Sequence, residues 1–263
     1  MTAKMNILMI GCGKMGGAML RRWCDACGHS FAVVDPAMPD LPPAVRVESE
    51  LSALSSQVFD MIIVAIKPQM IESVLPDYKG SLKNGGVVVS IAAGFALRNF
   101  SKILGDVPLV RVMPNLPALI GLGATGLYAN ALCSHGQKNT VEELMEAVGR
   151  AFWVNSEDEL DKVTAVSGSG PGYVFQIIES YIAAAEDLGF KADEARALVL
   201  QTILGATEMA NRSSEAISAL RESVTSKNGT TEAGLNALNG DGALDTLMKQ
   251  TTDAAYKRAI ELQ

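Results

Sequence analysis

NILMIGCGKMG, residues 6–16, is the stretch that decides the fold. A short apolar run leads directly into glycines spaced G-x-G-x-x-G, at Gly11, Gly13 and Gly16. This spacing indicates a dinucleotide-binding loop when a strand precedes it and a helix follows it, and both are expected here. Gly11 would make the tight turn, Gly13 would let a pyrophosphate approach the backbone, and Gly16 would let the helix pack closely on the strand. The alternative is a glycine turn without a ligand.

The rest of residues 1–155 alternates between short apolar runs and helical patterns, which is typical of βαβ units. Strands are predicted at 6–10, 31–35, 61–66, 87–91, 109–112, 124–128 and 152–155. Helices are predicted at 15–27, 71–75, 97–104 and 141–148. The early strands are nearly continuous in Val, Ile and Ala, as expected for strands buried on both faces of a parallel sheet. The first half is therefore predicted to be an α/β domain with a Rossmann-type, doubly wound sheet.

Beyond residue 156 the pattern is helical and contains almost no strand-like run. Helices are predicted at 173–188, 192–211, 213–224 and 244–262. The sequence therefore predicts two domains, a dinucleotide-binding (Rossmann) domain at 1–155 and an all-helical domain at 156–263. Since a thin helical layer buries too little apolar surface alone, we expect this half to dimerise.

Composition narrows the class of protein. Hydrophobic residues make up 48% of the 263 residues and charged residues 19%, which is an ordinary globular balance. The formal net charge of −7 argues against nucleic acid or an anionic membrane as partner, since both need a basic surface. The longest apolar runs, such as 61–66 and 87–93, are far shorter than a membrane span, and the run at 7–10 is too short for the core of a signal peptide. We expect a cytoplasmic protein.

The cysteines do not point to redox or metal chemistry. Cys24 and Cys27 form a C-x-x-C pattern, but a reactive pair needs its first thiol at a helix N-terminus. The helix should begin near Lys14, which places Cys24 well inside it. Adding His29 gives three candidate zinc ligands, one fewer than a structural site uses. The sequence therefore predicts no metal site.

An acidic residue, Asp35, ends the second predicted strand. At this position a carboxylate usually bonds the ribose hydroxyls of NAD and repels the additional phosphate of NADP. No Arg follows it, since residues 36–39 read PAMP. The sequence therefore predicts NAD(P)H as cofactor, with NADH preferred. The alternative is that Asp35 only caps the turn before Pro36.

Two further segments lie at the carboxyl ends of predicted strands, where open α/β sheets bind their ligands. The first is AIKP at 65–68, and the second is SIAAG at 90–94. Small residues there leave room for a nicotinamide ring. Lys67 would approach a cofactor phosphate or ribose, or would be a solvated loop lysine.

Six motifs occur in the order found in pyrroline-5-carboxylate reductases, and the chain resembles that family over residues 7 to about 240. They are GCGKM at 11–15, AIKP at 65–68, SIAAG at 90–94, RVMPN at 111–115, VSGSGPGYVF at 166–175 and VTSKNGTTEA at 224–233. The resemblance implies reduction of (S)-1-pyrroline-5-carboxylate to L-proline by hydride transfer from NAD(P)H, the last step of proline biosynthesis. It also implies a helical half that both dimerises and binds substrate.

The resemblance assigns site residues position by position. The positions expected to bind the cofactor, with Asp35 and Ala65 added from the strand ends, are Gly11, Cys12, Gly13, Lys14, Met15, Gly16, Asp35, Ala65, Lys67, Pro68, Ala92, Ala93, Gly94, Met113, Pro114 and Asn115. The positions expected to grip the substrate are Ser226, Gly229, Thr230 and Thr231. In the family the partner subunit typically supplies this loop, so the resemblance implies a homodimer or a larger homo-oligomer, with decamers known.

Hydroxyl and amide groups of the predicted substrate loop suit a carboxylate anchor. We expect the Thr231 hydroxyl also to hydrogen-bond the imine nitrogen, which makes Thr231 the candidate catalytic residue. The alternative is a helix N-cap cluster, because Thr230, Thr231 and Glu232 precede an apolar helix. The segment 167–172, SGSGPG, follows a helical run rather than a strand and predicts a close-packed helix break, not a second phosphate loop.

The chain departs from the family at three places. Lys227 and Asn228 replace the usual Pro and Gly of the substrate loop. Since Asn tolerates left-handed backbone angles, the turn is expected to survive. Lys227 would attract a carboxylate or point to water. Gly172 stands where Ala is usual, and Asp35 where polar or basic residues are common in NADPH-preferring members.

Three alternative functions can each be distinguished from a pyrroline-5-carboxylate reductase by one observation. A β-hydroxyacid dehydrogenase would carry a catalytic Lys on its first long helix, but residues 172–187 contain no Lys. A reductase of another small cyclic imine would explain the altered loop at Lys227 and Asn228. A nucleotide-sensing protein would bind the cofactor without turnover, so oxidation of the cofactor by substrate separates it from an enzyme.

Overall fold

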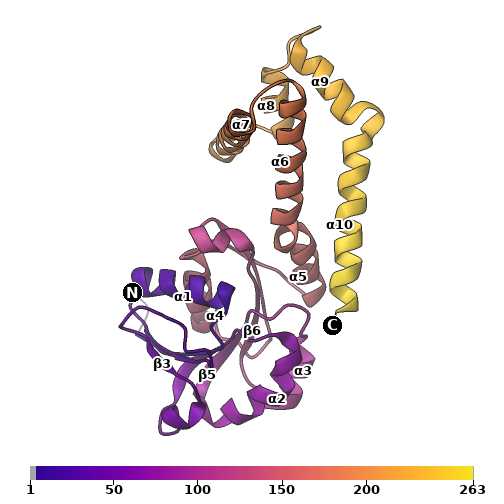
Figure 1. The fold of residues 1–263 in the computed structure, drawn as a ribbon. Coiled ribbons are helices and arrows are strands. Elements are labelled where there is room, and N and C mark those ends of the chain that lie inside the picture. Colours follow the sequence, from indigo (N-terminus) through magenta and orange to yellow (C-terminus); the bar gives the residue numbers. More distant parts are fainter. Residues whose placement is uncertain (1–3, 263) are drawn as a thin grey trace. The chain divides into compact units, whose positions relative to one another are not determined.

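The computed structural model describes residues 4–262 (Figure 1). The outermost residues of the two predicted domains, 1–3 and 263, lie outside the described part. The chain packs as two compact units. The first unit consists of the chain up to Pro171 together with the segment from Ala255 onward, and the second unit is Gly172–Ala254. The first unit thus extends past residue 155, where the sequence pattern changes.

Eight strands form a single sheet within the described residues of the first unit. The order across the sheet is β3-β2-β1-β4-β5-β6-β7-β8, and only the β6–β7 pair is antiparallel. Their bounds are β1 Asn6–Ile10, β2 Ser30–Val34, β3 Arg46–Glu48, β4 Phe59–Val64, β5 Leu82–Ser90, β6 Leu109–Met113, β7 Gly123–Ala129 and β8 Gly149–Trp153. The strand order reverses between β1 and β4, as in a doubly wound sheet, so the predicted Rossmann-type fold is confirmed.

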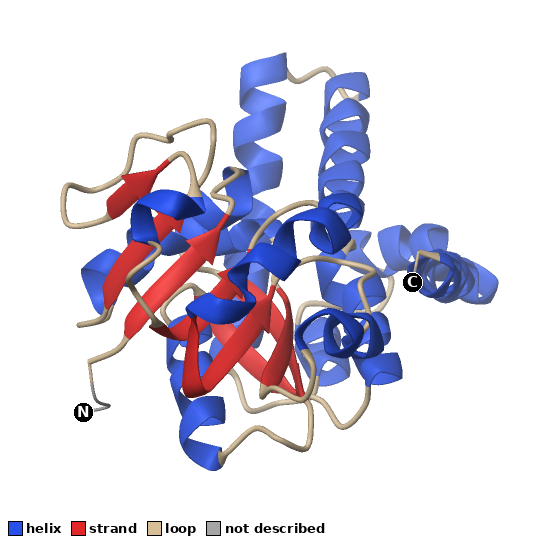
Figure 2. Cartoon of the chain, turned by 90° about the horizontal axis from the view of Figure 1, so that it is seen from below, coloured by secondary structure: helices blue, strands red, loops and turns tan. Residues whose placement is uncertain are grey.

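Helices cover both faces of this sheet (Figures 1 and 2). Ile7 and Met9 of β1 belong to the core under α1, Lys14–Ala26, and α4, His135–Glu146. The residues between and after them, Leu8 and Ile10, belong to the core under α2, Pro68–Val74, and α3, Leu97–Leu104. Because successive side chains of a strand point to opposite faces, an unbroken apolar strand serves two cores at once.

Most predicted elements of the first unit are present, and the differences have local causes. Each predicted strand overlaps one of β1, β2 and β4–β8, but β5 begins five residues earlier than predicted and β8 three residues earlier. The short strand β3, RVE, was missed because three mostly polar residues carry no periodic signal. Helix α4 begins earlier than predicted, at His135, because Ser134 and Gln137 form a capping box. Helix α5, Glu157–Val163, lies in the stretch after residue 156 that was expected to be helical, although the sequence did not give its bounds; Ser156 caps it.

The predicted helix break at 167–172 is wrong. Thr164–Gly168 is a π-helical turn, and α6, Gly170–Asp187, follows almost at once. The Ser169 N–H donates to the Thr164 carbonyl at 2.9 Å, which widens the helix rather than ending it. The close packing that the small residues suggested is present, because a Cβ on Gly168 would lie 2.9 Å from the Met113 methyl carbon.

The second unit is helical throughout its regular structure, as predicted. It contains most of α6, then α7 Ala192–Arg212, α8 Ile217–Ser223, α9 Thr230–Asn239 and the larger part of α10, Ala243–Glu261. Helix α8 is shorter than the predicted 213–224, since Ser213 caps the end of α7. The last turns of α10 belong to the first unit, where the Tyr256 hydroxyl donates to Asp158 of α5.

The second unit buries few apolar side chains. Among its described residues, the buried apolar cluster consists of Ala185, Ala195 and Val199. Large apolar side chains such as Phe175, Tyr181 and Leu198 are exposed instead. In the described part of the chain, no helix combines the length and the apolar character required to cross a membrane.

Candidate dinucleotide and substrate sites

The first glycine of the loop has no room for a side chain. Gly11 follows β1 with a φ of +77°, and its N–H donates to the Val34 carbonyl of β2 at 2.9 Å. A Cβ there would lie 2.6 Å from Cγ2 of Ile66 and 3.1 Å from the Ala65 carbonyl oxygen. Both the left-handed backbone and the close approach of the β4–α2 segment therefore require glycine.

The surroundings of the other two glycines fit the roles that the spacing predicts. A Cβ on Gly16 would lie 3.2 Å from the Ala65 Cβ and 3.4 Å from the Met9 sulfur, so α1 packs closely on the sheet. A Cβ on Gly13 would meet nothing within 4 Å, and no side chain caps α1. Open space lies in front of uncapped N–H groups at this helix end, which fits a pyrophosphate.

Asp35 is fixed on the glycine loop. Its Oδ2 accepts the Cys12 N–H at 2.7 Å, and its Oδ1 accepts the Ala37 N–H at 2.8 Å. The carboxylate therefore caps the turn that follows β2 and also braces the glycine loop between β1 and α1. The turn-capping alternative and a ribose contact are compatible, because each oxygen retains a free lone pair.

A cavity of about 500 Å³ lies at the carboxyl ends of β1, β2 and β4. This edge includes the point where the strand order reverses, which is where doubly wound sheets bind ligands. Six of the predicted cofactor residues line the cavity: Gly11, Cys12, Gly13, Asp35, Ala65 and Lys67. Lys67 is exposed and is the N-cap residue of α2, with Pro68 at the first helical position.

The cavity wall carries more negative than positive charge. Three carboxylate residues line it, Asp35, Glu50 and Asp77, against Lys67 as the cationic residue among its described lining. Sequence reasoning missed Glu50 and Asp77, since both lie in 3-10 or loop segments outside any motif. Burial, with Asp77 nearby, raises the pKa of the lining residue Tyr78 to about 12, so its hydroxyl stays neutral.

Three cysteines of the first unit have raised pKa values and are held as thiols. Burial and the Asp35 carboxylate raise the pKa of Cys12 to about 11, against a smaller lowering effect of Arg21. Cys24 lies near the C-terminal end of α1, and burial raises the pKa of both Cys24 and Cys27. A redox pair requires the opposite shift. Within residues 4–262, no group of three or more His, Cys, Asp or Glu side chains is placed to hold a metal ion.

The two segments predicted to hold the nicotinamide leave the same edge of the sheet. Ala92, Ala93 and Gly94 follow β5, while Met113 ends β6 and leads into Pro114 and Asn115. The strands β5 and β6 are parallel neighbours, with Ser90 opposite Arg111. These six residues do not line the cavity described above, nor do Lys14, Met15, Gly16 and Pro68.

Asn115 is held on both sides. Its side-chain N–H donates to the Ser167 carbonyl at 3.0 Å, and its side-chain oxygen accepts the Ala124 N–H at 2.9 Å. The side chain is buried and links the end of β6 to β7 and to the π-helical turn. Its side-chain amide therefore fixes the Met113–Pro114 segment, and its carbonyl accepts the Ala118 N–H at 3.0 Å.

The substrate loop of the second unit makes the turn that the sequence predicts. The Gly229 N–H donates to the Ser226 carbonyl at 3.0 Å, with Lys227 and Asn228 between them. Asn228 has a φ of +58°, so it takes the left-handed position that the family usually gives to Gly. The expectation that the turn survives these two substitutions is confirmed.

The loop hydroxyls are not used for capping. Helix α9 begins at Thr230 with Gly229 as N-cap and no side-chain cap, and Glu232 accepts the Asn228 N–H at 2.7 Å instead. Ser226, Thr230 and Thr231 are exposed, and in the described chain none of their hydroxyls has a hydrogen-bond partner. The N-cap alternative for the two threonines is therefore wrong. Their hydroxyls are available to a ligand.

Comparison with known proteins places both halves in one family. A family model described as pyrroline-5-carboxylate reductase dimerisation matches residues 157–262, and one described as NADP oxidoreductase coenzyme F420-dependent matches residues 6–94. The pyrroline-5-carboxylate reductase of Pseudomonas aeruginosa is 42% identical over 217 residues, covering 82% of this chain and 78% of its own length. The chain belongs to the pyrroline-5-carboxylate reductase family.

Solved structures of this family share the whole fold. A pyrroline-5-carboxylate reductase from Coxiella burnetii has a TM-score of 0.91 and 34% identity, covering 99% of both chains. The Plasmodium falciparum pyrroline carboxylate reductase, solved with NADP bound, has a TM-score of 0.86 and 27% identity, covering 100% of this chain and 99% of its own. The family resemblance therefore extends over both units.

Proposed function

We propose that the chain reduces (S)-1-pyrroline-5-carboxylate to L-proline with a hydride from NAD(P)H, the last step of proline biosynthesis. The observation that carries this proposal is a dinucleotide cavity built on the glycine loop of a chain from this family. The relatives named as pyrroline-5-carboxylate reductases support the substrate, and the NADP-bound structure from Plasmodium falciparum supports the cofactor class.

The residues of the first unit bind and orient. Gly13 and the uncapped start of α1 hold the pyrophosphate, and Asp35 bonds the ribose. Residues 92–94 and 113–115 hold the nicotinamide. The cofactor supplies the hydride, so the chain's contribution is orientation and electrostatics.

The residues of the substrate loop bind the other reactant. Ser226 and Thr230 anchor the carboxylate, while the Gly229 N–H, bonded to the Ser226 carbonyl, holds the turn that presents them. The Thr231 hydroxyl donates to the nitrogen of the neutral imine or accepts from the N–H of the protonated iminium. The exposed, unpartnered hydroxyls of this loop support that assignment. Lys227 adds a positive charge beside the anchor.

Homo-oligomerisation completes the site in this proposal. The match of residues 157–262 to a dimerisation model and the exposed apolar side chains of α6 and α7 support a homo-oligomer. A homodimer, in which the loop of one subunit serves the cofactor of its partner, is the smallest active assembly that we propose. A decamer is the larger form implied by the resemblance, and light scattering distinguishes the two. The proposed location is the cytoplasm.

NADH is the preferred cofactor in this proposal. A 2′-phosphate next to Asp35 would meet a carboxylate fixed by two backbone N–H groups, in a cavity that also contains Glu50 and Asp77. Like charges at close range are costly in a partly enclosed site. Parallel assays with NADH and NADPH test the preference, and equal kcat/KM values or a higher value with NADPH would contradict it.

The test of the function itself is oxidation of NAD(P)H driven by pyrroline-5-carboxylate, with proline identified as product. Folded, oligomeric protein that oxidises neither cofactor would contradict the proposal. Turnover with a different cyclic imine would then favour a reductase of another substrate, an alternative suggested by Lys227 in the substrate loop. Cofactor binding without turnover on any imine would favour a nucleotide sensor.

A further inference from the structure

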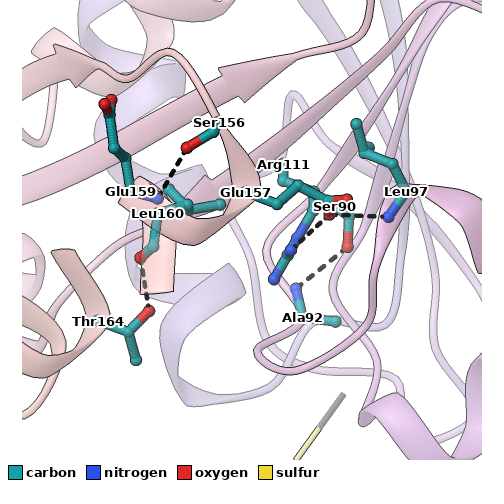
Figure 3. Close-up of polar contacts among 9 residues, drawn as sticks. All are labelled: Ser90, Ala92, Leu97, Arg111, Ser156, Glu157, Glu159, Leu160 and Thr164. Carbon is teal, nitrogen blue, oxygen red and sulfur yellow. Dashed lines mark hydrogen bonds and ion pairs between the residues drawn. The ribbon is translucent and has the colours of Figure 1, made fainter. Parts of the chain in front are cut away.

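An ion pair between a buried arginine and a partly exposed glutamate lies beside the two segments proposed to hold the nicotinamide (Figure 3). The Arg111 guanidinium of β6 donates from Nη1 to Oε1 of Glu157 at 2.6 Å. The arginine side chain is 5% exposed and the glutamate side chain 29%. Glu157 is the first residue of α5, whose start is fixed by the Ser156 hydroxyl accepting the Glu159 N–H at 3.1 Å.

The same glutamate oxygen makes a second bond. Oε1 of Glu157 accepts the Leu97 N–H at 2.9 Å, at the first residue of α3. One carboxylate oxygen therefore joins β6 to the start of α3. Since Arg111 precedes Met113 by two positions and Leu97 follows Gly94 by three, the bonds reach both nicotinamide segments through the backbone.

Ser90 closes the arrangement on the side of β5. It is buried and pairs with Arg111 across the β5–β6 ladder. Its hydroxyl oxygen accepts the Ala92 N–H at 3.2 Å, so it shapes the first residues of the 92–94 segment. Hydrogen bonds thus hold residues 92–94 and residues 113–115 close to the strand ends from which they leave.

A gain in stability is a weak explanation for this pair. Replacing a buried ion pair by packed apolar side chains is often neutral or stabilising, because desolvation opposes the charge attraction. Among the described residues, the buried Arg111 Nε also has no hydrogen-bond partner, so the guanidinium is incompletely satisfied. Unlike an apolar contact, the ion pair and its hydrogen bonds are directional, so they fix the positions of β6, α3 and α5 relative to one another.

We propose that Arg111 and Glu157 are positioning residues for hydride transfer. They hold residues 92–94 and 113–115 in the separation at which the nicotinamide face is presented to the imine. The inference rests on the proposed function. Because a displacement of about 1 Å can lower a transfer rate by about 100-fold, a loosened pair should lower kcat strongly.

The main test compares Glu157→Ala with Glu157→Gln. Alanine removes the acceptor of both bonds, whereas the glutamine oxygen can still accept from Arg111 and from the Leu97 N–H. We expect Glu157→Ala to lower kcat by about 10-fold or more. Its Kd for NADH should change little, since the cavity around Asp35 is untouched, and Glu157→Gln should recover most of the lost kcat.

A control with the same set of bonds, but with a more exposed cation, lies at the amino ends of β1 and β4. Asp60 accepts the Asn6 N–H and the Lys83 ammonium, both at 2.9 Å, so it also joins a cation and a backbone N–H. Asp60→Ala should lower the melting temperature while leaving kcat unchanged.

A second variant keeps the test independent of the buried charge. Leu97→Pro removes the backbone donor together with the leucine side chain, at a first helical position where proline is tolerated; Leu97→Ala controls for the loss of the side chain. Ala96 already has φ −73° and ψ 153°, as a residue before proline needs. Compared with Leu97→Ala, which keeps the N–H, Leu97→Pro should have a lower kcat and a similar Kd for NADH.

The outcomes separate this inference from the proposed function. A wild-type protein without turnover on pyrroline-5-carboxylate would contradict the proposed function and, with it, the inference. An active wild type in which Glu157→Ala behaves like Asp60→Ala, or in which Glu157→Gln restores nothing and NADH affinity falls in parallel, would overturn the inference alone.

Discussion

The two units of this chain obtain their stability in different ways. In the first unit, Ile7 to Ile10 of β1 are at most 1% exposed and feed two cores, one on each face of the sheet. In the second, Phe175 is 57% exposed and Leu204 62%, around a small cluster of Ala and Val. The sheet is therefore complete within one chain, whereas the helical layer requires an external surface to cover it.

The largest expected effect comes from breaking the sheet unit. The Trp23 side chain is fully buried, and its Nε1–H donates to the Leu144 carbonyl at 2.6 Å. Trp23→Ala should lower the free energy of unfolding by about 3–5 kcal/mol, because it leaves a cavity and an unpaired carbonyl. Denaturant unfolding followed by circular dichroism measures this. If the two units differ in this way, Phe175→Ala should leave the free energy of unfolding of the first unit unchanged. A decrease as large as that of Trp23→Ala would refute the difference.

The next effect concerns assembly. Phe175→Asp places a charge on the apolar surface of α6, so it should raise the dissociation constant of the dimer by at least about 30-fold, the effect of a hot-spot residue. Sedimentation at several protein concentrations measures it. Val58→Asp is the control, since Val58 is 54% exposed on the first unit. An unchanged mass for Phe175→Asp would mean that a different surface covers the helical layer.

A smaller effect is expected in the substrate loop. Thr231→Ala should lower kcat by about 10- to 100-fold, as expected for loss of one hydrogen bond to a charged group. Thr231→Ser should retain most of the activity because it keeps the hydroxyl. The Kd for NADH should stay constant, since the glycine loop lies in the other unit. Unaltered kcat and KM in Thr231→Ala would remove Thr231 from the mechanism.

The smallest effect tests the altered turn. Asn228 has a left-handed backbone, which costs Ala about 1 kcal/mol more than Gly. Asn228→Gly should therefore keep both stability and the KM for the imine, while Asn228→Ala should raise that KM. A lower KM in Asn228→Gly would show that asparagine compromises the loop.

Sequence reasoning succeeded where function depends on local patterns. The glycine spacing, the unbroken apolar strands and the amphipathic helix at 97–104 each carry their own signal, and β1 and α3 match the prediction in full. The left-handed turn at Asn228 could also be predicted, because backbone tolerance is a property of the residue itself.

It failed where distant residues meet. Glu50 and Asp77 reach the cavity from segments without periodicity, and Arg111 and Glu157 are 46 positions apart in the chain. The π-helical turn was missed because small residues allow a widened helix as readily as a break. One signal was available and overlooked, the Ser134–Gln137 capping box that starts α4.

The most direct test of the central claim is the rate of NADH oxidation by oligomeric protein with (S)-1-pyrroline-5-carboxylate, run in parallel with NADPH at equal concentration. We expect turnover to proline, with the higher kcat/KM for NADH. No oxidation of either cofactor by folded, oligomeric protein would contradict it.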